Sequence, residues 1–350
     1  MKKFLLLLLC GFAFADNKVI NGNLDFYSRG GATSTSSGYL FDRFKTQITS
    51  TGVIQQSKQT TVPASTSANV VNSLQIQATT AEASPASTSR VDVSYNMEGN
   101  DLLELRGRTM TMSFWVRSPK TGVHCFSMAN AGGTRSYVTT YSISSANTFE
   151  KKTITLKHDS SGTWSYDNAL GARFSWSVLG GSNFQASTLN TWLSGNFTSH
   201  SSCANTLDAT SAPWYLTQVM LNQGSKAEPF SLRGGSIAGE SGMVKRYYEK
   251  SYNFNVAPGA LDASGVNTYI LARNSITSGM VQLSEEKRTT PTVVIYSHST
   301  GASGVLRNQT SASDNAATGE EIGTRAFRVN SAVPSDQDIV SYHWTADAEF

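Results

Sequence analysis

The chain has 350 residues, of which 15% are charged, and a formal net charge of +3. This near-neutral balance contains no long run of basic residues, which excludes the concentrated basic face that nucleic-acid binding needs. Aromatic residues make up 10% of the chain and argue against disorder, and the abundance of Ser, Thr, Asn and Gly favours an all-β protein of short strands and polar turns.

Residues 1–15, MKKFLLLLLCGFAFA, are typical of a secretory signal peptide. Two lysines precede an apolar stretch, and the closing Ala-Phe-Ala provides the small residues that a signal peptidase needs. The apolar stretch is short for a membrane span, and no later stretch is longer and equally apolar. We therefore expect a leader at 1–15, export, and no membrane span in the rest of the chain.

Residues 16–238 show the pattern of a β-sandwich. The segment 30–90 is rich in Ser, Thr, Ala and Gln, but its apolar residues recur at strand period, which favours edge strands over a low-complexity linker. Clearer strands follow, separated by Gly, Asn, Asp and Ser. They are expected at 110–116, 123–126, 137–143, 153–156, 174–178 and 214–221. This many regularly spaced strands indicates a sandwich or jelly roll.

A helical connector is expected at 239–253, where Met243, Val244, Tyr247 and Tyr248 lie near helical spacing and Ser241 is a candidate N-cap. A smaller C-terminal β domain should occupy 254–350. Its expected strands are 269–271, 279–283, 292–296 and 339–344.

Two cysteines, Cys125 and Cys203, follow the leader. Export permits a disulfide between them, but spacing does not show whether their Cα atoms lie close enough. Two unpaired, half-buried thiols are the alternative. Neither cysteine has the spacing of a zinc site.

No catalytic motif stands out. None of the five histidines lies in HExxH or beside GxSxG. Glycoside cleavage would need a pair of carboxylates. The adjacent acids are Asp101/Glu104, Glu285/Glu286 and Glu320/Glu321. We interpret them as solvated surface groups and expect no enzymatic activity.

Eight segments, in order across residues 17–252, resemble a module of phage tail-fibre and receptor-binding structural proteins. They are VINGNLDFYSRGG, YLFDRF, MTMSFWVRSPKTG, NTFEKKTITL, DSSGTWSYDNALGARFSW, GSNFQASTLNTWLSGNF, LTQVMLNQGSKAEPFSLRG and KRYYEKSY. RTTPTVVIYS and the final YHWTADAEF resemble the β domain that often follows in such proteins.

The resemblance implies a sandwich like that of carbohydrate-binding modules, carried on a virion tail and used for host attachment. It implies a cell-surface glycan as ligand, other virion tail proteins as partners, and a homotrimer. The leader departs from the family, because tail proteins are assembled in the cytoplasm. A secreted, prophage-derived carbohydrate-binding protein and a purely structural tail or baseplate component are the alternatives.

Candidate glycan-binding residues are Trp164, Tyr166, Asp167 and Asn168, which share a Gly/Ser-rich loop. Aromatic faces stack on sugars, and Asp or Asn side chains bind their hydroxyls. The alternative is that this pattern forms a structural plug.

No cofactor is expected apart from a candidate structural Ca²⁺, for which Asn23 and Asp25 are the oxygen donors near the first strand.

Overall fold

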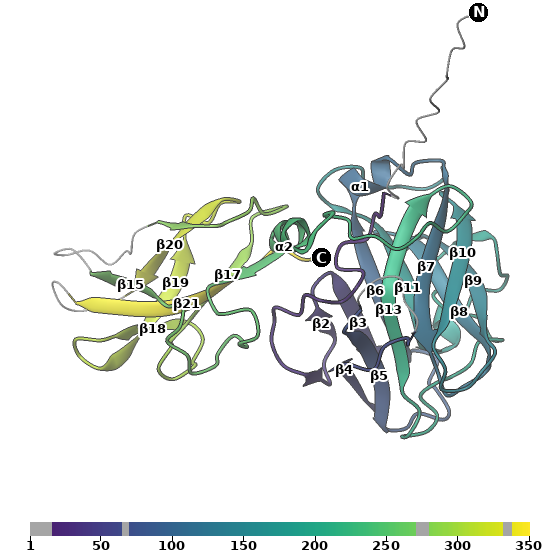
Figure 1. Ribbon diagram of the computed structural model, residues 1–350, viewed down its shortest axis with the longest axis horizontal. Coiled ribbons are helices and arrows are strands. Elements are labelled where there is room, and N and C mark those ends of the chain that lie inside the picture. Colours follow the sequence, from purple (N-terminus) through teal and green to yellow (C-terminus); the bar gives the residue numbers. More distant parts are fainter. Residues whose placement is uncertain (1–15, 65–69, 271–279, 332–337) are drawn as a thin grey trace, which may run out of the picture.

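The computed structural model describes residues 16–64, 70–270, 280–331 and 338–350. It is an all-β protein in which a jelly-roll β-sandwich is followed by a short helix and a smaller C-terminal β domain (Figure 1). The expected leader at 1–15 lies outside the described residues, as do Leu271 and Gly279 at the ends of two expected strands. No helix among the residues described is long and apolar enough to cross a membrane.

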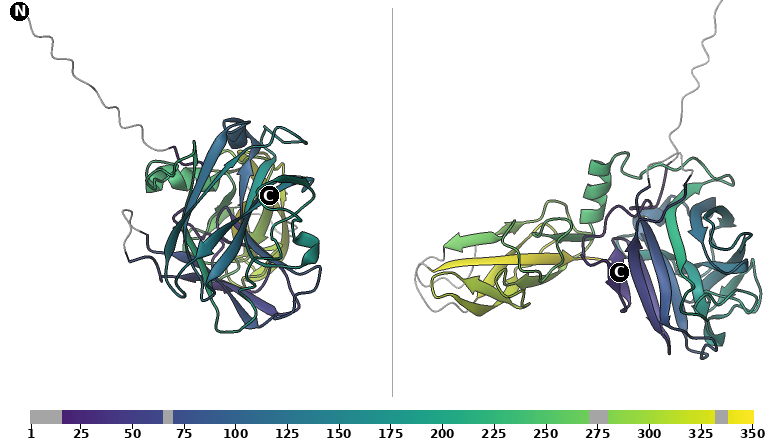
Figure 2. Two further views of the ribbon diagram at one scale, coloured as in Figure 1. Left: turned by 90° about the vertical axis from the view of Figure 1, so that its right-hand side faces the viewer. Right: turned by 60° about the horizontal axis from the view of Figure 1, so that its bottom comes forward.

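The N-terminal domain consists of two antiparallel sheets packed face to face (Figure 2). Sheet A contains, in spatial order, β1 (Thr33–Ser34), β4 (Val53–Gln59), β5 (Ser73–Thr80), β13 (Trp214–Gln223), β7 (Thr109–Arg117) and β10 (Glu150–Lys157). Sheet B contains β12 (Trp192–Ser194), β9 (Arg135–Ile143), β8 (Gly122–Asn130), β11 (Leu170–Gly180), β6 (Arg90–Glu98), β3 (Phe44–Thr49) and β2 (Gly38–Phe41).

The core lies between the two sheets, because alternate residues of each strand are apolar and point inward. At its centre the ring of Trp176 meets those of Phe114 and Phe126, with centroids 5.4 and 5.2 Å away. All three side chains are fully buried. Each of the six strands expected between residues 110 and 221 is confirmed, as β7 to β11 and β13.

The short helices lie at the ends of strands. They are α1 (Gly99–Leu103), the 3-10 turn η1 (Ser182–Phe184) and α2 (Ile237–Lys245). The expected cap at Ser241 is wrong, because α2 begins earlier: extended Ser236 accepts a hydrogen bond from the Gly239 amide at 3.1 Å. The end of the expected connector is instead strand β14 (Tyr248–Lys250), which belongs to the C-terminal domain.

The C-terminal domain is built around the long strand β21, coloured yellow in Figure 1. Its strands are β14, β15 (Asn267–Ile270), β16 (Val281–Gln282), β17 (Thr292–Tyr296), β18 (Val305–Asn308), β19 (Ser313–Glu320), β20 (Ala326–Ser331) and β21 (Ile339–Asp347). β14, β15, β17 and β18 all pair with β21. A separate core extends from Val281 to Ala346. Strands β18, β19 and β20 were not predicted from the sequence.

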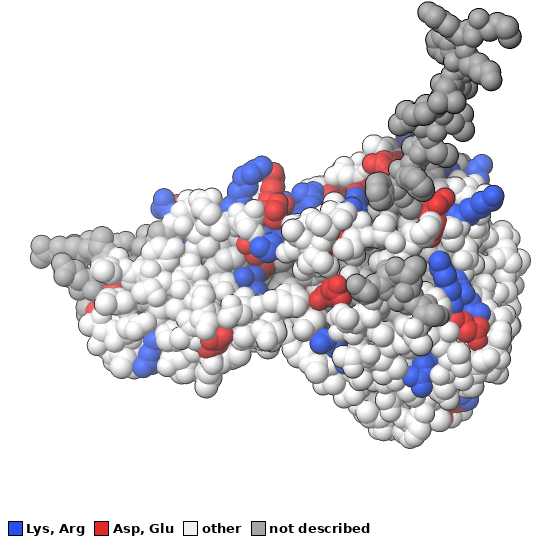
Figure 3. Space-filling view, viewed as in Figure 1, with Lys and Arg blue, Asp and Glu red and all other residues white. Residues whose placement is uncertain are grey.

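Charged residues of both signs gather where the two domains meet (Figure 3). Arg43, in the β2–β3 turn, is fully buried and pairs with Glu349, whose side chain is 3% exposed. Arg29 contacts Asp42 at 2.8 Å and Asp347 at 3.0 Å. The segments that carried the family resemblance thus supply the polar contacts of the junction.

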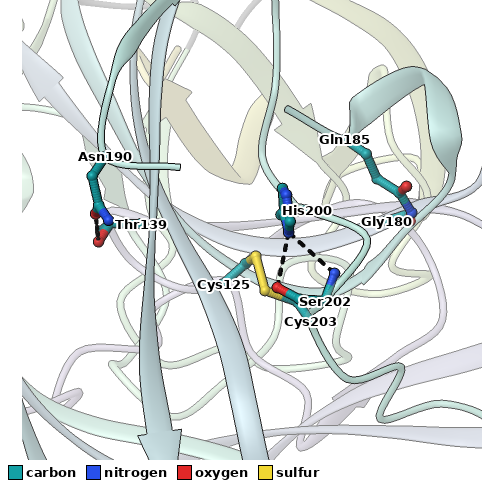
Figure 4. Close-up of a disulfide and its surroundings, with 8 residues drawn as sticks. All are labelled: Cys125, Thr139, Gly180, Gln185, Asn190, His200, Ser202 and Cys203. Atoms are coloured by element: carbon teal, nitrogen blue, oxygen red, sulfur yellow. Dashed lines mark hydrogen bonds between the residues drawn. A yellow bond between two sulfur atoms is a disulfide. The ribbon is translucent and has the colours of Figure 1, made fainter. Parts of the chain in front are cut away.

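A disulfide joins Cys125 of β8 to Cys203, with 5.7 Å between the Cα atoms (Figure 4). Of the two alternatives left open by the sequence, the structure has the bonded one. Cys203 belongs to residues 181–206, here called the cover segment, which includes the edge strand β12 and packs against Cys125 and Val138 of sheet B. Its apolar side chains pack with Cys125 in a small separate core. They include Ala186, Leu189, Leu193 and Phe197.

Replacing both cysteines with serine is expected to lower the free energy of unfolding by about 2–4 kcal/mol, because the bond closes a long loop. Urea denaturation of the full chain, with and without a reductant, measures the effect. The reductant should destabilise the native protein and leave the double variant unchanged. If the native protein and the double variant are equally stable without reductant, the bond contributes nothing to stability.

Candidate functional site

A groove of about 240 Å³ lies on the outer face of sheet B. Its lining is mostly polar and comes from three neighbouring strands, from the cover segment and from the C-terminal segment. The lining residues are Lys45, Gln47, Arg90, Asp92, Ser94, Asn96, Leu170, Arg173, Asn196 and Phe350. Pockets for small ligands usually enclose about 300–1,000 Å³, so this groove suits one or two small units of a larger ligand.

The alternation of β6 explains why the floor is polar. Val91, Val93, Tyr95 and Met97 are fully buried in the core, so the residues between them face outward. The outward-facing residues are Arg90, Asp92, Ser94 and Asn96.

The pairing of β6 with β3 and β11 extends this polar surface across the sheet. Ser94 lies opposite Lys45 on β3 and Ser175 on β11, and Asn96 lies opposite Arg173 on β11. The groove is therefore built on regular strands, which hold its floor in a fixed geometry.

Two of the three cations in the groove have partners. Arg90 forms an ion pair with Asp92, and its guanidinium lies 5.3 Å from the ring centroid of Phe184. Lys45 donates a hydrogen bond to the carbonyl oxygen of Phe350 at 3.0 Å. These contacts hold both side chains in place within the groove.

The side chain of the third cation, Arg173, forms no hydrogen bond or ion pair with another residue in the part of the chain that the structure describes. Burial lowers the pKa of its guanidinium, and the nearby charge of Arg90 lowers it further. Arg173 is thus a partly buried cation whose donors are available to a ligand.

Two amide oxygens of the groove, Asn96 Oδ1 and Asn196 Oδ1, are buried without a hydrogen-bond partner. Buried polar atoms are nearly always paired, so such exceptions need a reason. The other end of the Asn96 amide is fixed, because it donates to the hydroxyl of Tyr39 at 3.2 Å. Burial, together with the Glu349 carboxylate, raises the pKa of Tyr39 to about 12, so this hydroxyl keeps its proton at neutral pH.

Trp164, a candidate glycan-binding residue, is almost completely buried. Trp164 is only 8% exposed; its indole packs 4.4 Å from the ring of His158 and edge-on to Trp192, and its N–H donates to the Ser161 carbonyl. A covered ring has no face for a sugar, so the structural-plug alternative describes this Trp. Burial lowers the pKa of His158 to about 4, which keeps the neighbouring imidazole neutral.

The remaining residues of that loop do not gather into one site. Tyr166 is half-buried against the core. Asp167 is exposed and accepts a hydrogen bond from the Ala169 amide. The Asn168 amide donates to the carbonyl oxygen of Arg288 at 2.6 Å, which makes it a contact between the domains.

The candidate calcium donors lie together. Asn23 donates a hydrogen bond to Asp25, whose other oxygen accepts one from Asn72 at 3.4 Å. Across the described residues, no group of three or more His, Cys, Asp or Glu side chains is arranged to hold a metal ion. Calcium at Asn23 and Asp25 stays a prediction from the sequence.

The groove residues of β6 were not identified from the sequence, although the signal was present. RVDVSYNME alternates apolar and polar residues without interruption. What the sequence does not show is which of many polar strand faces is left open and which is covered.

Comparisons with known proteins give structural likenesses only. No protein-family model matches the chain, and no curated protein matches it. Solved structures that resemble it include the enzymatically active domain of tailspike protein 4 of bacteriophage CBA120, with 13% identity and a TM-score of 0.33, where the match covers 60% of this chain and 22% of the tailspike chain.

Two further structures are a putative sugar binding protein from Bacteroides thetaiotaomicron and a family 11 carbohydrate-binding module from Clostridium thermocellum. The first has 10% identity and a TM-score of 0.36 and covers 59% of this chain and all of its own. The second has 12% identity and a TM-score of 0.28 and covers 55% of this chain and 99% of its own. At such values these likenesses carry no functional information about this chain.

Proposed function

We propose that the groove on sheet B binds a cell-surface glycan without cleaving it, and that the chain is an attachment protein. The observation that carries the proposal is a polar groove on rigid strands whose half-buried cation, Arg173, has no side-chain hydrogen bond or ion pair within the described residues. Such a group gains most from a ligand that brings its own acceptors.

A sugar fits this surface chemically. Its hydroxyls donate to amide oxygens and accept from amide, hydroxyl and cationic donors, and the groove offers all of these in Asn96, Gln47, Ser94 and Arg173. Phe350 also lines the groove, and its ring is packed against Arg288 and Tyr247 at the domain junction.

The carboxylates favour binding over cleavage. Among the side chains that line the groove, that of Asp92 is the one carboxylate, and it is paired with Arg90. Glycosidases generally need two carboxyl groups on opposite sides of the scissile bond. The adjacent acids considered as an alternative are engaged elsewhere: Asp101 pairs with Arg233, and Glu104 with Lys18.

The proposed location is outside the cell, on a virion tail or as a secreted protein. The Cys125–Cys203 disulfide supports an oxidising compartment, and it agrees with a leader at 1–15. A homotrimer and tail-protein partners belong to this proposal through the family resemblance alone.

Gln47→Ala together with Ser94→Ala is expected to weaken glycan binding about ten-fold, since each lost hydrogen bond contributes about 0.5–1.5 kcal/mol. Labelled full-length protein is bound to candidate host cells before and after periodate oxidation of their sugars, while the supernatant is assayed for released oligosaccharide. Gln55→Ala, on the half-exposed surface of β4 in sheet A, is the matched control.

Periodate-sensitive binding without release supports a non-catalytic glycan adhesin. Release of oligosaccharide would instead show an enzyme. Absence of binding to every cell tested, with co-purification of tail proteins, would favour the purely structural alternative.

A further inference from the structure

We infer that the groove selects an anionic saccharide, whose carboxylate or phosphate pairs with Arg173. This inference rests on the proposed function and specifies the chemical class of its ligand.

The charged side chains of the groove are mostly cationic. They are Lys45, Arg90 and Arg173 against the single side-chain carboxylate of Asp92. Asp92 is already committed to Arg90. The Lys45 ammonium is held at a wall by the Phe350 carbonyl oxygen. The cation left for a ligand is therefore Arg173.

Arg173 is also placed to face a ligand. It lies on β11 between Asn96 of β6 and Ala129 of β8, its neighbours in the register. The small side chain of Ala129 provides no group for the guanidinium to bond. The Asn96 amide, whose Oδ1 is unpartnered, is adjacent on the other side. Arg173 thus presents a planar set of donors next to a buried acceptor.

The guanidinium of Arg173 matches the chemistry of a sugar acid. A guanidinium binds a carboxylate or phosphate through two parallel hydrogen bonds, which a neutral hydroxyl does not reproduce. A hydroxyl next to the acidic group on the same sugar can pair with Gln47, which lines the same groove. A neutral sugar would give the guanidinium no ion-pair partner.

Energetics point the same way. Arg173 is partly removed from water, and repulsion from Arg90 outweighs attraction to Asp92 at its guanidinium. A partly desolvated charge is unfavourable unless it gains a direct partner. An anionic ligand relieves the repulsion and replaces the lost hydration, so its binding should depend on salt concentration.

The test uses full-length protein and surface polysaccharide purified from cells that it binds. The polysaccharide is compared untreated, after carboxyl reduction with carbodiimide and borohydride, and after removal of phosphate with hydrofluoric acid. Arg173→Gln is expected to weaken binding to the untreated polysaccharide ten-fold or more, and Arg173→Lys to retain part of it. Arg108→Gln, which removes an equal charge from an exposed site directly before β7, should bind as the native protein does.

Loss of binding after carboxyl reduction identifies a uronic-acid type of ligand, and loss after phosphate removal a phosphorylated glycan. If both treated polysaccharides bind as tightly as the untreated one, and Arg173→Gln binds as the native protein does, the inference is overturned while glycan binding stands. If no cell or polysaccharide binds, the proposed function fails as well. Unchanged thermal unfolding of Arg173→Gln separates a ligand contact from a structural role.

Discussion

Trp176→Ala is expected to lower the free energy of unfolding of the N-terminal sandwich by about 3–5 kcal/mol, the range for a large aromatic side chain removed from a core. Trp176 on β11 is fully buried, and its ring makes edge-on contacts with Phe114 of the opposite sheet and Phe126 of β8, and a tilted one with Phe44 of β3. Its loss leaves a cavity where the two sheets meet. Because β11 also carries Arg173, the same substitution should weaken glycan binding.

Urea denaturation followed by tryptophan fluorescence or circular dichroism measures the change. Trp176→Phe is the matched control, since it keeps most of the ring and removes an indole N–H that is buried without a partner. We expect it to cost about 1–2 kcal/mol. A loss of less than about 1 kcal/mol for the Ala variant would mean that the sandwich closes over the vacant space and that Trp176 is not central to its packing.

Glu349→Gln is expected to destabilise the junction between the two domains by about 3 kcal/mol, because it leaves the buried Arg43 guanidinium without its counter-charge. The side chain of Arg43 is fully buried and that of Glu349 is 3% exposed. Arg43 is held in place by further groups: the Asn96 carbonyl oxygen accepts from it, and the ring of Tyr247 lies 3.4 Å away. With the charge fixed and unpaired, the neighbouring C-terminal segment should detach from the sandwich.

Asp347→Asn provides the comparison. Asp347 pairs with Arg29 across the same junction, but its side chain is 41% exposed, so we expect a loss below about 1 kcal/mol. Thermal unfolding reports stability, and limited proteolysis reports whether the C-terminal domain separates. Equal losses for the two variants would contradict the dependence on burial. Since Phe350 lines the groove, Glu349→Gln should also reduce glycan binding and Asp347→Asn should not.

The sequence motifs and the structure assign different roles to the same residues. Asp42 and Arg43, which carried part of the family resemblance, lie at the domain junction rather than at a ligand site. Arg43 adopts a left-handed backbone conformation with φ of 71°, which a long side chain seldom takes and which turns it into the interface. Trp164 likewise matched a motif and is part of the core.

The sequence by itself determined the fold class, the strands of the sandwich and the presence of a second β unit, because each depends on local periodicity and turn chemistry. Side chains from Met110 to Val116 alternate between the two faces of their strand, wherever that strand lies in the fold. The pairing of Cys125 with Cys203, the polar junction and the groove were decided by the tertiary structure. They depend on which strands become neighbours: Asn96 and Arg173 are far apart in the chain and meet only because β6 pairs with β11. The cover segment then fills one part of the outer face of sheet B and leaves Arg173 partly exposed, which no local pattern encodes.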